Sequence, residues 1–385
     1  MKSALVRIFV AAFLLWSPCV IQAQKTEQLA VKFSPSVLVP SVLDRSVFER
    51  RDLIYGSEIG AWDQDGGTAV NSPTARRNII AAKIRVIRWG NWAKFDDMNQ
   101  GGSAPKQTLA QFNNAVDGIR TLGAVAMIKL PPIWDKQCEG AIDYWNLEWL
   151  KEIIKNAGSR VQLYEFGNEP DHYCNMTGTT YGQKWNETVP ALKKYARSLG
   201  FEIFVGGPAM ANNYVHSLEV VNDFLKTVKS AYVVDHDRDF IPDFVSSHTY
   251  PNTTENVTLT DFLNRIDYWG KVYDTMRQNI DEIWQGESDG NGQSLGPQIK
   301  LADSEWNMVT GNDPRAMDPR WTKPYVAKMF RMFREHHIWL ANLFTISSHK
   351  GAALDMLKAD GTPKPLYESF AAVSTTDPLN KDENR

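Results

Sequence analysis

Two glutamates at the ends of short apolar runs are the residues of this chain best suited to catalysis. Glu169 lies within VQLYEFGNEPD, residues 161–171, where a buried strand must stop because glycine and proline follow it. Glu305 ends a second apolar run, IKLADSEWN, residues 299–307. More than a third of the chain separates the two glutamates. Only a fold that gathers the ends of distant strands could bring them into one site.

The chemistry open to such a pair is the cleavage of a glycosidic bond. One carboxylic acid protonates the leaving oxygen and one carboxylate attacks the anomeric carbon, with the two carboxyl groups about 5–5.5 Å apart. Each glutamate also has a plainer interpretation, Glu169 as a carboxylate at a helix N-terminus and Glu305 as a solvated loop charge. Because both follow predicted strands, the paired, catalytic interpretation is favoured.

The elements that must position the two glutamates follow a βα pattern. After residue 50, short β-rich runs alternate with longer amphipathic ones, which is typical of a parallel sheet with crossover helices. The predicted strands are 53–60, 84–89, 125–130, 161–166, 203–206, 244–248, 300–304 and 339–346. The predicted helices are 73–82, 108–122, 145–156, 181–199, 217–230, 259–280, 325–333 and 365–373. These units predict an α/β fold, a (β/α)8 TIM barrel over residues 51–375; the rival doubly wound sheet would need a Gly-rich phosphate loop that this chain lacks after its first strand.

The segments outside the barrel predict export. Residues 1–23 have the features of a signal peptide, because Lys2 and Arg7 precede an apolar run and a small residue ends it. No later segment is long and apolar enough for a membrane helix, so we expect a secreted or periplasmic protein. The mature chain would be mildly acidic, which argues against a nucleic-acid partner. Residues 24–50 form an N-terminal extension whose packing the sequence does not predict, and residues 376–385 are expected to form a flexible tail.

Other groups with chemical potential are few. Export would leave two cysteines, Cys138 and Cys174, which could form a disulfide in an oxidising compartment or remain two free thiols. Four Asn-x-Ser/Thr sequons could carry glycans only in a eukaryotic secretory route. The stretch ESDGNG at 287–292 resembles the start of a calcium loop but lacks the bidentate glutamate that such a loop needs. We therefore predict no metal site.

Short motifs at the predicted strand ends resemble those of the clan A glycoside hydrolases. Residues 167–170, GNEP, resemble the acid/base motif of the clan, and residues 304–307, SEWN, resemble its nucleophile strand. Arg88, SHTYP at 247–251 and DGTPKP at 360–365 are similar too. Within the clan, HTYP and EWN resemble glycoside hydrolase family 39; YGSE and EWN also resemble family 51, less closely. The likeness is patchy but spans the barrel by order and spacing.

The resemblance implies a role for each matched residue. It implies that Glu169 is the acid/base and Glu305 the nucleophile of a retaining double displacement. It implies that Asn168 hydrogen-bonds the 2-hydroxyl of the sugar. Arg88 would lie near Glu305 and keep it ionised, although a strand-end arginine can also be a purely structural ion-pair partner.

Further residues are expected around the sugar. The resemblance implies that His248 and Tyr250 contact the nucleophile or the sugar. Glu58, at the end of the first strand, is expected to bind a sugar hydroxyl, with an exposed loop carboxylate as the alternative. The last strand lacks the tryptophan that often floors the sugar site in the clan, which leaves the sugar open. Tryptophans beside the catalytic positions are expected to stack on sugar rings, with a place in the barrel core as the alternative: Trp89, Trp92 and Trp306.

These expectations combine into a secreted retaining glycoside hydrolase that needs no cofactor. Its substrate would be a polysaccharide or oligosaccharide, cleaved by an activity of the xylosidase, arabinofuranosidase or endo-glycanase type. Two alternatives stay open on the sequence. One is a carbohydrate-binding barrel without catalysis, and the other is a Schiff-base barrel aldolase that uses Lys129, at the end of the third predicted strand.

Overall fold

The computed structural model describes most of the predicted barrel. The described residues are 45–60, 63, 65–90, 107–130, 146–211, 214–251, 257–308, 313–347 and 353–380. The predicted signal peptide, Trp92 and Cys138 lie outside this part of the chain.

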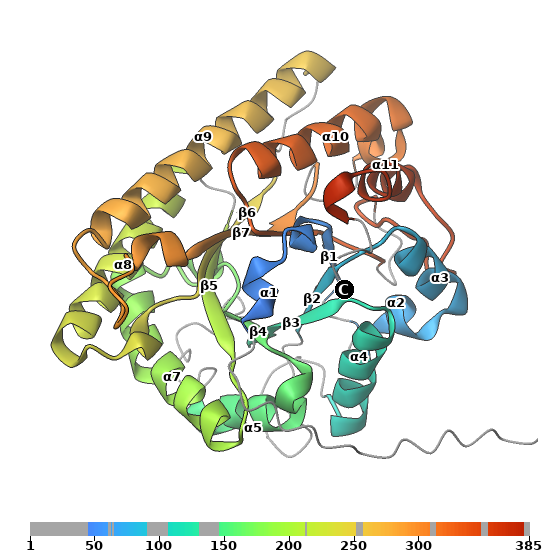
Figure 1. Cartoon of the computed structure of the whole chain (residues 1–385). Helices are drawn as coiled ribbons and strands as arrows, with labels where there is room; N and C mark the ends of the chain where they lie inside the picture. The colour runs from blue at the N-terminus through green and yellow to red at the C-terminus, as the bar shows by residue number, and fades with distance from the viewer. Residues whose placement is uncertain are drawn as a thin grey trace, which may run out of the picture. The chain divides into compact units, whose positions relative to one another are not determined.

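Parallel strands close into a barrel in the order β1 to β8, and β1 also pairs with β8 (Figure 1). This closed sheet confirms the predicted (β/α)8 TIM barrel. The third strand matches its predicted bounds, whereas the fifth and seventh run further than expected. The strands are β1 (Gly56–Glu58), β2 (Val86–Trp89), β3 (Val125–Leu130), β4 (Leu163–Phe166), β5 (Phe204–Met210), β6 (Phe244–Thr249), β7 (Lys300–Trp306) and β8 (Leu340–Leu343).

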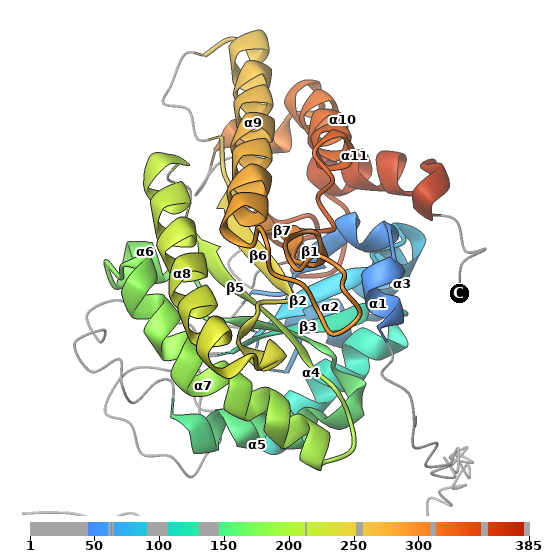
Figure 2. The same cartoon turned by 60° about the vertical axis from the view of Figure 1, so that its left-hand side comes forward.

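Helices cover the outside of the barrel, and neighbouring helices such as α7, α8 and α9 lie side by side along it (Figure 2). The α-helices are α1 (Ser46–Glu49), α2 (Gly67–Asn71), α3 (Pro73–Ala81), α4 (Leu109–Thr121), α5 (Leu147–Ala157), α6 (Pro170–Tyr173), α7 (Gly178–Ser198), α8 (Tyr214–Asp235), α9 (Leu259–Ile283), α10 (Pro319–Glu335) and α11 (Pro365–Ser374). Short 3-10 helices are η1 (Asp52–Ile54), η3 (Gly158–Arg160), η4 (Arg238–Phe240), η5 (Gly296–Gln298), η6 (Pro314–Met317) and η7 (Pro378–Asn380). Within the described residues, none of these helices combines the length and apolarity that crossing a bilayer would require.

The helix starts follow from capping residues in the sequence. Thr108 and Gln111 form a reciprocal capping box at the start of α4. The Thr177 and Thr258 hydroxyls accept backbone N–H bonds at the starts of α7 and α9. These caps explain why the helix starts fall within a few residues of those predicted.

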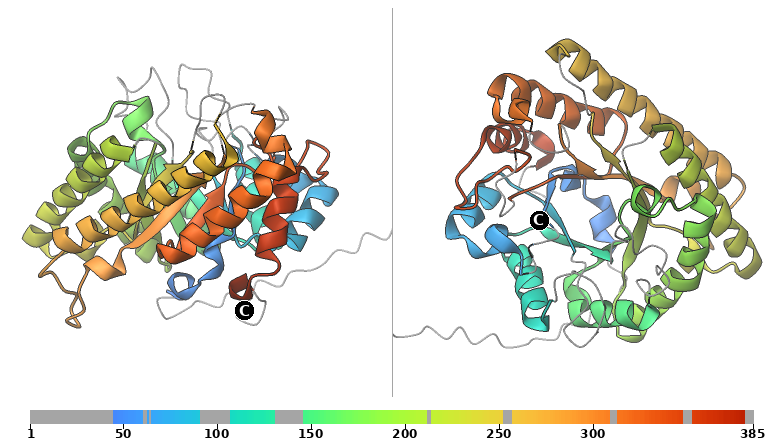
Figure 3. Two further views of the ribbon diagram at one scale, coloured as in Figure 1. Left: turned by 90° about the horizontal axis from the view of Figure 1, so that it is seen from above. Right: turned by 180° about the vertical axis from the view of Figure 1, so that it is seen from behind.

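The core has an inner layer inside the barrel and an outer layer between sheet and helices. The inner layer includes the large side chains of Met127, Leu163 and Phe244. At the N-terminal end of the strands, α1 closes this layer, because Phe48 stacks on Trp339 with ring centroids 4.8 Å apart. The left view of Figure 3 shows α1 at this end of the barrel. Residues 45–50 of the predicted extension therefore pack under the barrel.

The C-terminal segment differs from the flexible tail expected from residue 376. Asn380 is buried, and its side-chain oxygen accepts a hydrogen bond from Arg85. Its amide donates to the Ser374 carbonyl at 2.9 Å and to the Lys83 carbonyl at 3.2 Å. The Asn380 side chain thus holds residues 376–380 in place through its hydrogen bonds to Arg85, Lys83 and Ser374. The sequence does not reveal these partners.

Candidate active site

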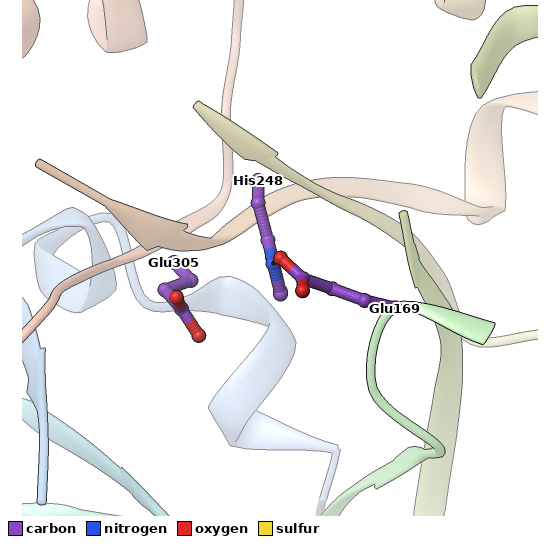
Figure 4. A group of neighbouring side chains, drawn as sticks. All are labelled: Glu169, His248 and Glu305. Atoms are coloured by element: carbon purple, nitrogen blue, oxygen red, sulfur yellow. Dashed lines mark hydrogen bonds and ion pairs between the residues drawn. The ribbon is translucent and has the colours of Figure 1, made fainter. Parts of the chain in front are cut away.

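Three side chains from different strands converge at the C-terminal end of the barrel (Figure 4). Glu169 follows β4, His248 lies near the end of β6 and Glu305 near the end of β7. One oxygen of each glutamate and one ring nitrogen of the histidine all lie within 4.8 Å of one another. A parallel barrel produces this meeting because all strands end at the same rim.

Glu169 is held in an uncommon backbone conformation. Its φ and ψ angles of 47° and 49° place it in the left-handed region, which costs a non-glycine residue about 1 kcal/mol or more. Its N–H donates to the Ala209 carbonyl at 2.8 Å, and Pro170 begins α6 directly after it. The side chain is 13% exposed, and its Oε1 lies 2.7 Å from His248 Nδ1. The backbone thus turns sharply here and leaves the carboxyl at the mouth of the barrel.

A β-bulge directs Glu305 into the barrel. Asp303 pairs with Ser247 of β6, but the next pair joins Glu305 with His248, so Ser304 is an extra residue on β7. In a regular strand, residues two apart point to the same face. Here Asp303 instead faces Tyr273 of the outer helix α9, and Glu305 faces inward.

Two donors hold the carboxylate of Glu305. Arg88 Nη1 donates to its Oε2 at 3.0 Å, and the Tyr250 hydroxyl donates to its Oε1. Burial raises the pKa of the Tyr250 hydroxyl well above its usual range, and the charge of Glu305 adds to this, so the phenol keeps its proton. Both donors therefore bind and orient the carboxyl group that is the candidate nucleophile.

Arg88 is the hub of a buried charge network. It is fully buried, and besides Glu305 it donates to Glu165 at 2.7 Å, to Glu58 at 2.5 Å and to Asn168 at 2.6 Å. Burial alone would lower the pKa of Arg88, but the carboxylates of Glu165, Glu58 and Glu305 outweigh it and raise that pKa. Arg88 therefore stays charged, and its positive charge compensates the buried carboxylates around it.

His248 links the acid/base candidate to this hub. Its Nε2 lies 3.5 Å from Arg88 Nη2, while its Nδ1 contacts Glu169. Burial lowers the pKa of His248, but the charge of Glu305 and the bond to Glu169 raise it more, so the net direction is upward. The imidazole can therefore hold the proton that it shares with Glu169.

Glu58 and Lys129 lie inside the barrel rather than in exposed loops. Both are buried, and Lys129 Nζ donates to Glu58 Oε1 at 2.5 Å. The other oxygen of Glu58 binds Arg88, and the side chain has no exposed surface through which a sugar hydroxyl could reach it. The sugar-binding role predicted for Glu58 does not fit this geometry. The ion pair also disfavours a Schiff-base role for Lys129, which needs an uncharged amine.

Trp89 and Trp306 do not line the site, contrary to prediction. The Trp89 ring packs on Phe112 of α4, and its indole N–H donates to the Asp63 carbonyl at 3.0 Å. Trp306 packs against Phe330 and other rings of α10. Each tryptophan directly follows an inward-facing site residue on its strand. Alternation of side chains therefore turns both rings toward the helices.

Glu165 belongs to the site but was missed from the sequence. It is fully buried on β4, where Leu163 faces the inner core layer and Glu165 follows it on the same face. Its Oε2 binds Arg88, and its Oε1 has no hydrogen-bond partner among the described residues. The available signal was a charged residue within an apolar strand.

Cys174 is disulfide-bonded. Its partner lies outside the described residues, and its pairing with Cys138 remains a prediction. A disulfide just after α6 would restrain the loop that follows Glu169.

The convergent group could also be considered as a metal site. Glu169, His248 and Glu305 are ligand types that divalent ions accept. Their donor atoms are already engaged, however, because Arg88 and Tyr250 bind the two oxygens of Glu305 and His248 Nδ1 contacts Glu169. The arrangement fits acid–base and nucleophilic chemistry better than metal binding.

The same barrel occurs in solved glycoside hydrolases. A xyloglucanase of glycoside hydrolase family 44 from Paenibacillus polymyxa has a TM-score of 0.56 at 11% identity, over 86% of this chain and 77% of that one. An endo-β-1,4-mannanase from Thermotoga petrophila has a TM-score of 0.53 at 13% identity, over 88% and 79%. A GH5-4 endoglucanase from Clostridum cellulovorans has a TM-score of 0.52 at 14% identity, over 85% and 94%. At these identities the likeness establishes the fold alone.

Comparisons of sequence add no family assignment. No protein-family model and no curated protein matches the chain. The shared barrel is consistent with the clan A resemblance, while the likeness to families 39 and 51 stays a prediction.

Proposed function

We propose that the chain is a retaining glycoside hydrolase in which Glu169 is the acid/base and Glu305 the nucleophile. The observation that carries the proposal is the approach of the two carboxyl groups, whose facing oxygens lie within 4.8 Å at the rim of the barrel. Retaining enzymes have the pair about 5–5.5 Å apart, whereas inverting enzymes need about 6.5–9.5 Å to admit a water molecule. The short separation supports double displacement.

The two carboxyl groups also have different hydrogen-bond partners, as the reaction requires. Glu305 is bound by Arg88 and Tyr250, which stabilise a carboxylate. Glu169 contacts His248, which can share a proton with it. One group is therefore prepared for attack and the other for proton transfer.

In the first step, a carboxylate oxygen of Glu305 bonds to the anomeric carbon. The bond from that carbon to the leaving oxygen breaks, and the leaving oxygen takes the proton of Glu169. In the second step, water gives a proton to Glu169 and attacks the same carbon, which releases Glu305. Each step inverts the anomeric centre, so the product keeps the configuration of the substrate.

We further propose that the substrate is a β-linked polysaccharide cleaved internally. Support comes from the solved barrels of similar architecture, which are a xyloglucanase, an endo-β-1,4-mannanase and an endoglucanase. A substrate of this size also fits the expected export of the protein, because polysaccharides are degraded outside the membrane. The xylosidase and arabinofuranosidase types expected as alternatives act on chain ends, so product size separates them from this proposal.

The test is a panel of xyloglucan, β-mannan, β-glucan, xylan and arabinan, with reducing ends counted and products sized. We expect one or more of the β-linked polysaccharides in this panel to yield oligosaccharides from the start of the reaction. Monosaccharides alone would indicate cleavage at chain ends. Binding without turnover, in a protein with both glutamates intact, would indicate a non-catalytic carbohydrate-binding barrel and would overturn the enzymatic proposal.

A further inference from the structure

The bulge at Ser304 interrupts β7 on both of its edges. Toward β6, the pairs Ser247–Asp303 and His248–Glu305 leave Ser304 unmatched. Toward β8, the register also shifts between Asp303 and Trp306. An irregularity shared by both neighbours is a property of β7 itself. It decides which face of the barrel wall Glu305 occupies.

Asp303, the last residue before the bulge, lies in an unusual environment. It is fully buried on the outer face of the sheet, where the Thr249 and Tyr273 hydroxyls face its carboxyl outside ordinary hydrogen-bond geometry. Tyr273 is itself fixed, because its hydroxyl lies 3.1 Å from Ser247 Oγ and 3.3 Å from Thr249 Oγ1. The carboxyl thus faces a hydroxyl cluster that joins β6 to α9.

We propose that Asp303 is a positioning residue for Glu305. Its carboxyl packs against the hydroxyls of Thr249 and Tyr273 and holds the outward side of the bulge, which keeps Glu305 directed into the barrel toward Arg88. The inference rests on the proposed function for the role of Glu305 as nucleophile. The structural role of Asp303 can be tested without any activity.

The ionisation of Asp303 supports this role. Burial raises the pKa of Asp303 from 3.8 to about 8, and the negative charge of Glu305 also raises it. The Thr249 hydroxyl and the charge of His248 lower this pKa, but by less. The other titratable groups facing it are Tyr273 of α9 and Tyr325 of α10; burial holds the pKa of both phenols well above the usual range. At neutral pH the protonated form of the carboxyl therefore predominates. Its ionisation would place a charge in the wall of the barrel, two residues from Glu305.

The activity test compares Asp303→Ala with Asp303→Asn on 2,4-dinitrophenyl β-cellobioside and β-mannobioside. These leaving groups need no acid, so the first step reports on Glu305. A misplacement of about 1 Å can lower a rate by about 100-fold, so we expect the alanine variant to lose at least about tenfold in kcat. KM should change little. The asparagine variant, which keeps the shape and the neutral polar character, should retain wild-type kcat to within about threefold.

Leu301→Ala is the matched control. Leu301 lies on the same strand and is buried in the outer core layer, but before the bulge. Its truncation should lower the melting temperature without a comparable loss of kcat. If Asp303→Ala does not fold, Asp303→Ser replaces it, because serine leaves a smaller cavity and a hydroxyl.

The second test follows thermal stability against pH for the wild type and Asp303→Asn. Between pH 3.8 and about 8 the unfolded chain has Asp303 ionised while the folded protein keeps it protonated. The folded state binds more protons in this range, so the stability that the proton gives is lost as pH rises. The asparagine variant has no such proton. The melting temperature of Asp303→Asn minus that of the wild type should therefore increase from about pH 4 to about pH 8 and then stay constant.

The outcomes separate this inference from the proposed function. Wild-type protein without activity on any probe would overturn the function, while the pH dependence of stability and a crystal structure of Asp303→Ala would still decide the role of Asp303. Parallel stability curves for wild type and Asp303→Asn, or an alanine variant with wild-type kcat and Glu305 unmoved in its crystal structure, would overturn the positioning role.

Discussion

Arg88 on β2 donates to Glu305 on β7 across the interior of the barrel, at 3.0 Å. The contact joins two residues 217 positions apart in the chain. It fixes the nucleophile candidate to a guanidinium that is itself held by two fully buried carboxylates. The orientation of Glu305 therefore depends on the barrel being closed.

The two glutamates can be distinguished by the stereochemistry of azide rescue. Glu169→Ala keeps the nucleophile but loses the base, so an activated aryl glycoside should form a glycosyl-enzyme that accumulates. Azide needs no base and should release a glycosyl azide of retained configuration. Glu305→Ala should give the inverted azide, because azide then attacks the substrate directly in a single displacement. Nuclear magnetic resonance of the anomeric proton reads the configuration. Azides of the same configuration from both variants would contradict the assignment, and configurations exchanged between the two variants would reverse it.

The pH dependence of kcat/KM should be bell-shaped, because one carboxyl group must be ionised and the other protonated. Activity should fall on the acidic side and, as the proton shared by Glu169 and His248 is lost, on the alkaline side. Glu169→Gln should lose the alkaline limb on substrates with good leaving groups, which need no acid. Initial rates on a dinitrophenyl glycoside at graded pH test this. An alkaline limb that persists unchanged in that variant would assign the acid to another group.

Tyr250→Phe should weaken the nucleophile without unfolding the protein. A hydrogen bond to a charged group contributes about 1.5–3 kcal/mol, so kcat should fall about 10- to 100-fold. The hydroxyl holds one oxygen of the Glu305 carboxylate, so its loss should act on kcat more than on KM. Tyr367→Phe is the control, because its hydroxyl donates to the Asn78 carbonyl at 2.9 Å, in the outer layer of the protein. A Tyr250→Phe variant with wild-type kcat would show that the hydroxyl does not act on Glu305.

The Lys129–Glu58 pair should be coupled in stability. Lys129→Met would leave the carboxylates of Glu58, Glu165 and Glu305 around Arg88 with one cation fewer, so it should cost about 3 kcal/mol in the free energy of unfolding. Adding Glu58→Gln removes one of these carboxylates and should recover part of the loss. Urea denaturation of the single and double variants at pH 7 measures the coupling. Lys328→Met breaks the exposed pair with Asp267 and should cost less than about 1 kcal/mol. Additive losses for the buried pair would contradict the network described here.

The sequence by itself determined the alternation of strands and helices and the two glutamates at strand ends. Hydrophobic periodicity and helix caps are local signals, so a single chain carries them without knowledge of its neighbours. The strand bounds of β3 and the start of α9 were predicted to the residue for this reason. The motifs around Glu169 and Glu305 are likewise contiguous, which is why both could be selected before the fold was known.

Only the tertiary structure decided which face each side chain occupies. Trp306 directly follows Glu305 in the chain, yet it packs against α10 while Glu305 faces Arg88. The bulge at Ser304 separates Asp303 from Glu305, although simple alternation would place them together. The charges of Glu58 and Glu165 meet at Arg88 only when the barrel closes. Register and burial arise from pairing between distant strands, so no local pattern could fix them.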